Sequence, residues 1–388
     1  MRSLQPRLPV LVALFCVALT LRPQIVGIGP LIPEIQDRFE SSHALVGLVG
    51  TIPVLGMGLL APVAAVLASR IGTRNGMTLA LVLIASFGLI RVASPSALAL
   101  VLLTVPVGIG MGLANALTPL AVKQRLPDRA AVGTGVYTTG IQIGSTASAA
   151  LAVPLAGALG GWRWALGVFS TVTLAMLVVW VVLMRGEGPH VRASLPRLPW
   201  RSSTAWLLVA IFATMGWAYY GLNAWLPDAY TERGWSDAAA GGLSAAMNLT
   251  AIPASFMMPW VSERFGRQSM LERLSVVFFL GVLGLVLVPD FAYAWCALTG
   301  ISQGGMFALT MTVPLDLEDR PERLGGLVAM MLGLGYTAAA TAPFVLGAIR
   351  DASGSFDGPL WAAAALLATL VVWVRLLGRA RRTTESTR

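Results

Sequence analysis

Apolar residues occur in twelve long runs separated by short polar breaks. A helix that crosses a bilayer needs about 20 mainly apolar residues, and the runs are about that long. The first six cover residues 9–33, 44–68, 76–93, 97–121, 131–157 and 163–184; the second six cover 204–227, 238–261, 270–288, 292–314, 324–349 and 358–377. The pattern predicts an all-α protein with twelve transmembrane helices.

The composition agrees with a membrane location. Hydrophobic residues make up 56% of the chain and charged residues only 12%, whereas a soluble protein carries about 25% charged residues. Such a chain cannot cover itself with a hydrophilic surface in water, so we expect a multi-pass integral membrane protein. Because small residues suited to signal cleavage are missing around Leu19 to Gln24, we expect the first run to be a retained helix.

Basic residues are distributed unevenly over the predicted loops. If both termini are cytoplasmic, 21 of the 27 Lys and Arg residues lie inside, 4 lie outside and 2 are embedded. The positive-inside rule demands such a bias, so we expect both termini inside and the protein in the inner (plasma) membrane. Topology then accounts for the net charge of +9, and without a long basic tract we expect no nucleic-acid partner.

The two halves of the chain repeat each other. Ile32-Pro33-Glu34 matches Leu226-Pro227-Asp228 at an offset of 194, and at that offset Arg70-Ile-Gly72 falls on Arg264-Phe-Gly266. Further matches in the fourth and tenth runs keep the same order. Parallel repeats predict two pseudo-symmetric six-helix bundles. We assign them to residues 1–184 and 204–388, with a cytoplasmic linker at 185–203.

Two bundles of six helices, each with a basic glycine turn after its second helix, resemble the major facilitator superfamily. In that family an acid in this turn helps to hold the cytoplasmic gate. The first turn here keeps Arg70 and Gly72 without the acid, and the second keeps Glu263, Arg264 and Gly266. The resemblance implies that these residues form gating loops. A turn that only anchors helix ends is the alternative.

A narrower resemblance is carried by Leu21-Arg-Pro, by the run from Gly29 to Ile35, and by Thr134-Gly-Val-Tyr137-Thr-Thr. These segments are similar to the cyanate permease and nitroimidazole transporter family within the superfamily. Substrates in that family are diverse, so the likeness implies the fold more than the substrate.

Arg22 is the most unusual residue of the first run. It follows a nearly uniform apolar stretch at residues 8–21, and three prolines and two glycines follow it. An arginine at the bilayer centre costs about 2.5–3.5 kcal/mol, so it marks a functional site by default. No acid lies at comparable depth, and an unpaired guanidinium suits a carboxylate-like anion. Alternatively, Arg22 binds helix carbonyls freed by Pro23 and fixes the kink.

Other polar side chains lie inside the predicted helices. In the superfamily the first, fourth, seventh and tenth helices line a central cavity, and the second, fifth, eighth and eleventh flank it. The resemblance makes the following residues candidates for substrate binding: Asn115, Tyr137, Gln142, Tyr219, Tyr220, Asn223, Asn248, Gln303 and Tyr336. Each is equally compatible with an interhelical hydrogen bond. Arg91, near the outer end of the third helix, can snorkel to the interface.

Several mechanisms lack the residues that they need. No P-loop is present, so we expect no ATP-driven transport. His43 and His190 lie in predicted polar segments far from the apolar Cys16 and Cys296, so we expect no metal site, no cofactor and no enzyme. Glu34 is the preferred candidate for proton coupling, although it is equally explained as an exposed acid at a helix end.

The hypothesis that follows is a secondary transporter of a small solute working by alternating access. Arg22 would bind a small anion such as cyanate or a carboxylate. The alternative is transport of small neutral or aromatic drugs such as nitroimidazoles, and a membrane receptor without transport is a third possibility. We expect a monomer in a lipid bilayer whose partners are the solute and, as a further option, protons.

Overall fold

The computed structural model describes residues 8–185, 197–318 and 320–386, without the side chains of 130, 131, 321, 322 and 381–386; most of the predicted linker, 186–196, is outside this part. In the first half the helices are α1 (Leu8–Thr20), α2 (Pro23–Val26), η1 (Gly29–Leu31), α3 (Ile32–Phe39), α4 (His43–Leu59), α5 (Ala61–Ile90), η2 (Arg91–Ala93), α6 (Ala97–Arg125), η3 (Pro127–Arg129), α7 (Ala130–Leu159) and α8 (Trp162–Leu183).

The second half is also built of helices. They are α9 (Ser203–Glu232), α10 (Asp237–Phe265), α11 (Arg267–Leu287), η4 (Pro289–Phe291), α12 (Ala292–Leu317), α13 (Pro321–Ala339), α14 (Ala342–Ser353) and α15 (Asp357–Ser386). Each of the twelve predicted transmembrane helices has a counterpart. The first corresponds to α1 through α3, and the eleventh to α13 and α14. The predicted all-α membrane fold is therefore confirmed.

The first transmembrane segment is broken, as its prolines and glycines predict. The helix ends at Thr20, resumes at Pro23, and is interrupted again at Gly27 and Ile28 before the 3₁₀ turn η1. Pro23 begins α2 and Pro30 lies in η1, where the missing proline N–H costs no internal helical hydrogen bond. The breaks leave Arg22 at the junction between α1 and α2.

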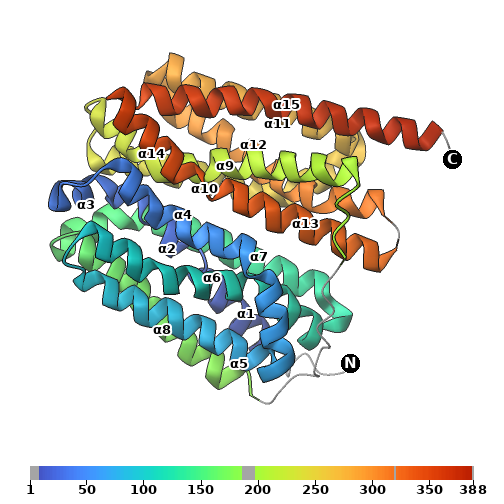
Figure 1. Ribbon diagram of the computed structural model, residues 1–388, viewed down its shortest axis with the longest axis horizontal. Coiled ribbons are helices and arrows are strands. Elements are labelled where there is room, and N and C mark those ends of the chain that lie inside the picture. Colours follow the sequence, from blue (N-terminus) through green and yellow to red (C-terminus); the bar gives the residue numbers. More distant parts are fainter. Residues whose placement is uncertain (1–7, 186–196, 319, 387–388) are drawn as a thin grey trace.

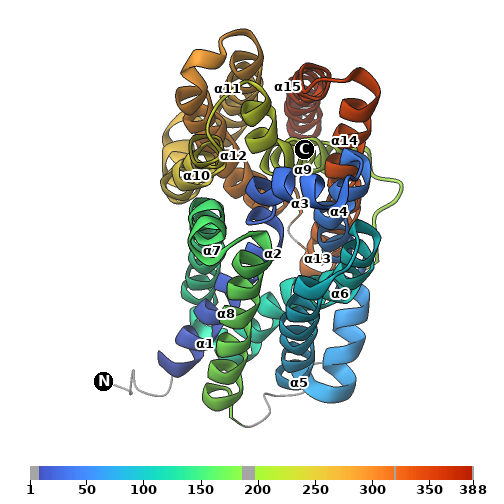
Figure 2. The same ribbon diagram turned by 90° about the vertical axis from the view of Figure 1, so that its left-hand side faces the viewer.

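The two bundles lie side by side, one built from the N-terminal half and the other from the C-terminal half (Figures 1 and 2). They meet where α7 packs on α10 and where α4 packs on α13 and α14. The start of α1 and the end of α15 are at one end of the molecule in Figure 1, and the α3–α4 and α14–α15 connections are at the other. We call these the inner and the outer end, following the predicted topology.

Length and apolar character mark nine helices of the described residues as candidate membrane spans, with α4 as a shorter apolar helix. Large apolar side chains such as Leu102, Val178 and Phe291 are exposed on the helices, as expected for surfaces that face lipid. The long helices α10 and α12 are not among the nine. Both carry internal polar residues, including Asn248 and Gln303.

The turns after the second and eighth transmembrane helices have the same backbone conformation. Gly72 has φ +80° and ψ +156°, and Gly266 has φ +82° and ψ +130°. A side chain at such angles is strained, so essentially only glycine adopts them. The repeated arginine–glycine pair thus marks a sharp reversal at the inner end of each bundle.

We predict that Gly72→Ala and Gly266→Ala each lower the free energy of unfolding by about 1–3 kcal/mol, the usual cost of a strained backbone conformation. Thermal unfolding of the purified protein in detergent measures the effect. Gly157→Ala is the matched control, because Gly157 is helical and a Cβ there has nothing within 4 Å. Equal melting temperatures for all three variants would show that the turns tolerate a side chain.

Candidate functional site

Arg22 lies between the two halves of the molecule and is only 7% exposed. Its Nη1 donates a hydrogen bond to the hydroxyl of Tyr220 on α9, and it lies 3.8 Å from the sulfur of Met57 on α4. The guanidinium carbon is also 5.5 Å from the centre of the Tyr220 ring. The arginine of the first bundle is therefore held by an aromatic side chain of the second.

Both direct polar partners of Arg22 are neutral. Within the described part of the chain its side chain forms no ion pair and donates to no backbone carbonyl. The alternative in which Arg22 fixes the kink by binding freed carbonyls therefore has no support in this conformation. A buried guanidinium with an uncompensated charge and unused donors is energetically costly.

A connected hydrogen-bond network lies beside Arg22. The Tyr219 hydroxyl donates to Asn248 Oδ1 at 2.8 Å, and Asn248 Nδ2 donates to Asn223 Oδ1 at 2.8 Å. The Asn223 amide in turn donates to the Tyr219 carbonyl at 2.9 Å. Ser145 Oγ lies 3.4 Å from the Tyr219 hydroxyl, so the network reaches from α9 and α10 to α7 of the first bundle. These side chains are mutually satisfied.

Three tyrosines gather around the arginine. The Tyr219 and Tyr220 rings have centroids 5.1 Å apart, and Tyr336 on α13 lies 6.5 Å from Tyr220. Tyr336 also makes an edge-to-face contact with Phe212 at 5.0 Å. Its hydroxyl has no hydrogen-bond partner among the residues that the structure describes, although the residue is 6% exposed. This leaves a free hydroxyl in the aromatic group.

The other predicted binding residues are not hydrogen-bonded to Arg22, to the three tyrosines or to the asparagine network. Asn115 on α6, Tyr137 and Gln142 on α7, and Gln303 on α12 make no side-chain hydrogen bond to another described residue. Gln303 is 9% exposed, and the other three are half-buried. They therefore retain free polar groups, in contrast to Asn223 and Asn248.

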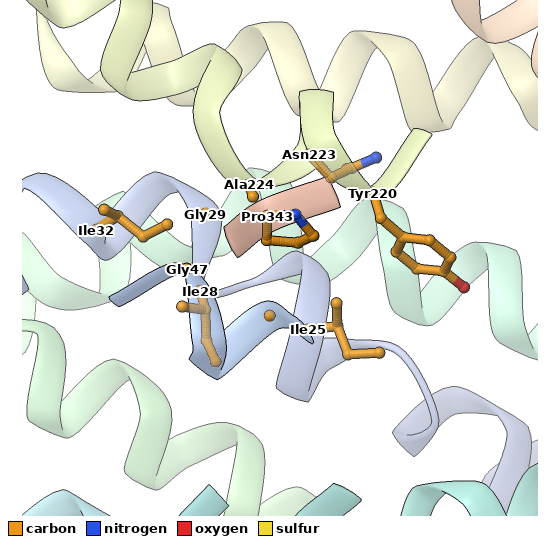
Figure 3. Close-up of a pocket in the computed structure, with 10 residues that line it drawn as sticks. Ile25, Ile28, Gly29, Ile32, Gly47, Tyr220, Asn223, Ala224 and Pro343 are labelled. Atoms are coloured by element: carbon orange, nitrogen blue, oxygen red, sulfur yellow. The ribbon is translucent and has the colours of Figure 1, made fainter. Parts of the chain in front are cut away.

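A small apolar pocket is lined by residues that follow Arg22 in the first segment and by residues of α9 (Figure 3). Ile25, Ile28 and Ile32 of the broken first segment lie on one side, and Tyr220, Asn223 and Ala224 of α9 lie on the other. The Tyr220 ring projects away from Ile32.

The backbones of the two halves approach closely beside this pocket. A Cβ added at Gly29 would lie 1.9 Å from the Asn223 carbonyl oxygen, and one at Gly47 would lie 2.5 Å from that of Pro343. Glycine is therefore needed at both positions for the outer side of the site to be closed in this conformation.

Arg91 does not snorkel, contrary to the sequence interpretation. It is fully buried, donates to Gln24 Oε1, and its Nη1 lies 3.3 Å from Thr104 Oγ1. Gln24 Nε2 reaches Ser170 Oγ at 3.3 Å. The guanidinium turns inward because the break after Thr20 brings Gln24 of α2 against η2. This contact attaches the short helix next to Arg22 to the rest of the first bundle.

Glu34 and the gating loops lie away from the central group. Glu34 is exposed at the outer end and accepts a hydrogen bond from the Trp162 backbone N–H at 3.1 Å, at the start of α8. At the inner end Arg70, Glu263 and Arg264 are exposed. Over the described ranges, none of these three forms an ion pair with the opposite half. The gating role of the loops and the proton role of Glu34 stay predictions.

Sequence reasoning missed several partners. Met57 and Ser145 contact Arg22 and Tyr219, and Gln24 contacts Arg91. Methionine and serine are common in apolar helices and carry no signal of their own. The buried glutamine two residues after Arg22 was a usable signal, because an amide in an apolar run needs a partner.

Comparisons with known proteins agree with the fold. A sequence profile of the Major Facilitator Superfamily matches residues 10–317 and 231–388. The chain is 29% identical to the 2-nitroimidazole transporter of Escherichia coli over 96% of each chain, and 28% identical to the cyanate transport protein CynX of the same species over 89% and 91%. A bacterial homolog of the human lysosomal transporter Spinster, in an inward-facing unoccupied conformation, superposes with a TM-score of 0.80 at 17% identity, covering 97% and 98%.

We predict that Asn248→Leu lowers the free energy of unfolding by about 1–3 kcal/mol, because Asn223 and Tyr219 lose buried partners. Gln303→Leu is the control: it also replaces a buried amide by leucine, but it breaks no hydrogen bond to a described residue. Denaturation followed by tryptophan fluorescence compares the two. Equal stability of the variants would mean that the network contributes nothing.

Proposed function

Because the chain belongs to the Major Facilitator Superfamily, whose members are membrane transporters of small solutes and not enzymes, we propose a more specific function for it. The two bundles alternate access to a central site, and Arg22 binds the negative group of a small anion there. The observation that carries this proposal is a buried guanidinium at the interface of the two halves with only neutral partners.

The geometry would allow Arg22 to exchange its hydrogen-bond partner Tyr220 for a bound anion. An anion that binds Arg22 would replace a hydrogen bond to a neutral hydroxyl with a charge-assisted one, which is roughly twice as strong. The free hydroxyl of Tyr336 and the unpaired amide of Gln303 are further donors on the second half. An anion held by both halves would stabilise conformations in which the halves are close.

Relatives support two solute classes. Cyanate, named for CynX, is a small anion and fits a site built on Arg22. A 2-nitroimidazole, named for the other relative, is a flat aromatic solute. The rings of Tyr219, Tyr220 and Tyr336 favour this second candidate function, because aromatic rings bind flat solutes by stacking. The two functions differ in how far they depend on Arg22.

The remaining assignments belong to the same proposal. Residues 1–184 and 204–388 are the two moving units, with 185–203 as a cytoplasmic linker. The protein works as a monomer in the plasma membrane, with a small-molecule solute and lipid as its partners. Asn115, Tyr137 and Gln142 line the path on the first bundle.

We predict that Arg22→Gln lowers the initial rate of cyanate uptake at low substrate about 10- to 100-fold, as expected when a hydrogen-bonded charge worth about 1.5–3 kcal/mol is lost. Arg22→Lys keeps the charge but loses the planar fork, so its rate should lie between those of the parent and Arg22→Gln. Uptake into proteoliposomes measures all three.

Arg38→Gln is the control, since it removes the same charge from an exposed position at the outer end and should leave the rate unchanged. Transport of 2-nitroimidazole is assayed in parallel. If Arg22→Gln transports cyanate as fast as the parent, the proposed anion site is wrong. If it no longer transports cyanate but still transports 2-nitroimidazole, the two solutes use different parts of the cavity.

A further inference from the structure

The outer ends of the two halves are joined by His43, at the start of α4. Its Nδ1 lies 2.7 Å from Asp351 Oδ1 on α14, and its Nε2 lies 3.6 Å from Asp228 Oδ2 on α9. One imidazole of the first bundle is thus placed between two carboxylates of the second. We call these three residues the outer contact.

The hydrogen bonds of Asp351 determine which His43 nitrogen carries a proton. Its carboxylate also accepts from the backbone N–H groups of His43, at 3.0 Å, and Ala44, at 2.9 Å. A carboxylate with three donors around it is held in the charged form, which accepts only. His43 Nδ1 must therefore be the donor to Asp351.

The other nitrogen then faces a second acceptor. In a neutral imidazole with the proton on Nδ1, Nε2 is an acceptor, yet it points at Asp228 Oδ2. That oxygen is buried and has no hydrogen-bond partner among the described residues, and Asp228 is only 6% exposed. The two acceptors lie 3.6 Å apart, slightly farther than a hydrogen bond, and repel each other unless one more proton lies on Nε2 or on Oδ2. The closed arrangement calls for that proton.

The charges around Asp228 favour retention of this additional proton. Asp228 faces Asp37 of α3, Glu232 of α9 and Arg350 of α14. Arg350 is already paired, because its Nε donates to Glu232 at 2.8 Å. Asp228 thus has two acids and one arginine near it among the described residues, and Asp351 adds a further carboxylate on the other side of His43, so the local field attracts a proton.

We propose that His43 and Asp228 form a proton-binding site that closes the outer side of the transporter. The proton comes from the outer water, binds to Nε2 or to Oδ2, and allows the two halves to meet. When the halves separate, water hydrates both groups, and an imidazole in water gives up its second proton between pH 5 and 8. The closed form thus holds one more proton than the open form, and acid favours closure.

This site differs from the one that the sequence suggested. Asp228 is the repeat counterpart of Glu34, but only Asp228 is buried and lies against the opposite half. Glu34 is exposed and accepts its hydrogen bond from within its own bundle. The inference rests on the proposed alternation of the two halves, but neither on Arg22 nor on the identity of the solute.

Spin labels at the outer end test the proposed proton site without any solute. Cysteines replace Arg38 on α3 and Ala352 on α14, both exposed, in a protein with Cys16→Ala and Cys296→Ala. Pulsed electron paramagnetic resonance gives the label distances between pH 5 and 8 in lipid nanodiscs. We expect the ratio of closed to open molecules to rise on acidification by up to tenfold per pH unit, the limit for one linked proton.

Two variants should remove the pH dependence of outer closure in different ways. Asp228→Asn supplies an amide that can donate to neutral His43 or, when turned over, accept from the protonated ring, so the closed population should be high and nearly independent of pH. His43→Gln has no titratable ring, and its amide can donate to the charged Asp228 carboxylate in place of the proton, so its closed population should also be independent of pH. Asp357→Asn is the matched control, since it removes a carboxylate at the same end that pairs with Arg233 at 2.9 Å within one bundle; its pH response should equal that of the parent.

The proton site would be overturned if the label distances of the parent protein did not change with pH. It would also be overturned if Asp228→Asn and His43→Gln both changed from open to closed at the same pH as the parent. Thermal melting shows whether each variant is folded. A parent that responds to pH while Arg22→Gln still carries cyanate would refute the anion site alone, so the two failures are distinguishable.

Discussion

The contact between Arg22 and Tyr220 determines much of the rest of the structure. A guanidinium at mid-depth has to be desolvated, and it finds no carboxylate among the described residues, only a hydroxyl, a sulfur and a ring face. The first transmembrane segment is broken at residues 21–22 and again at 27–28, so that Arg22 projects from a helix start and not from a continuous helix surface. Arg91 and Gln24 attach this broken segment to its own bundle. The arginine is therefore positioned by one half and contacted by the other.

The two halves contribute different chemistry to this interface. The second half presents Tyr219, Asn223 and Asn248, whose polar atoms satisfy one another. A satisfied network is rigid and gives little to a ligand. Donors without a partner among the described residues lie elsewhere, on Tyr336 and Gln303 of the second half and on Asn115, Tyr137 and Gln142 of the first, where Arg22 has only neutral partners. The repeat in sequence thus produces a symmetric framework of helices with an asymmetric centre, cationic on one side and aromatic on the other.

Much of this could be predicted from the sequence. Long apolar runs gave all twelve helices, because the bilayer demands a length and a composition that few other structures share. The depth of Arg22 and the break after it followed from counting residues and from its prolines. Gly72 and Gly266 were visible as repeated turns. The internal polar residues of α9 and α10 were identified, although their mutual satisfaction was not.

The pairing of side chains across helices could not be predicted in the same way. Helical periodicity says which face a residue occupies, but not which residue of another helix lies opposite. Arg91 illustrates this: its distance from the helix end permitted snorkelling, and only the rotation of η2 against α2 turns it inward. His43 lies at a loop in the sequence, 308 residues before its partner Asp351. Ser145 and Met57 acquire their roles solely from what α9 brings to them.

The Arg22–Tyr220 contact and the outer contact both include a residue of α9. Tyr220 contacts Arg22, and eight residues later in α9 Asp228 faces His43. At a rise of 1.5 Å per residue these positions are about 12 Å apart along a continuous helix. Both residues belong to α9, so a shift of this helix as a unit would change the distance between Tyr220 and Arg22 and that between Asp228 and His43 together. The proposed proton site at one end and the proposed solute site at Arg22 would then bias the same element, which is the physical requirement for coupling two sites.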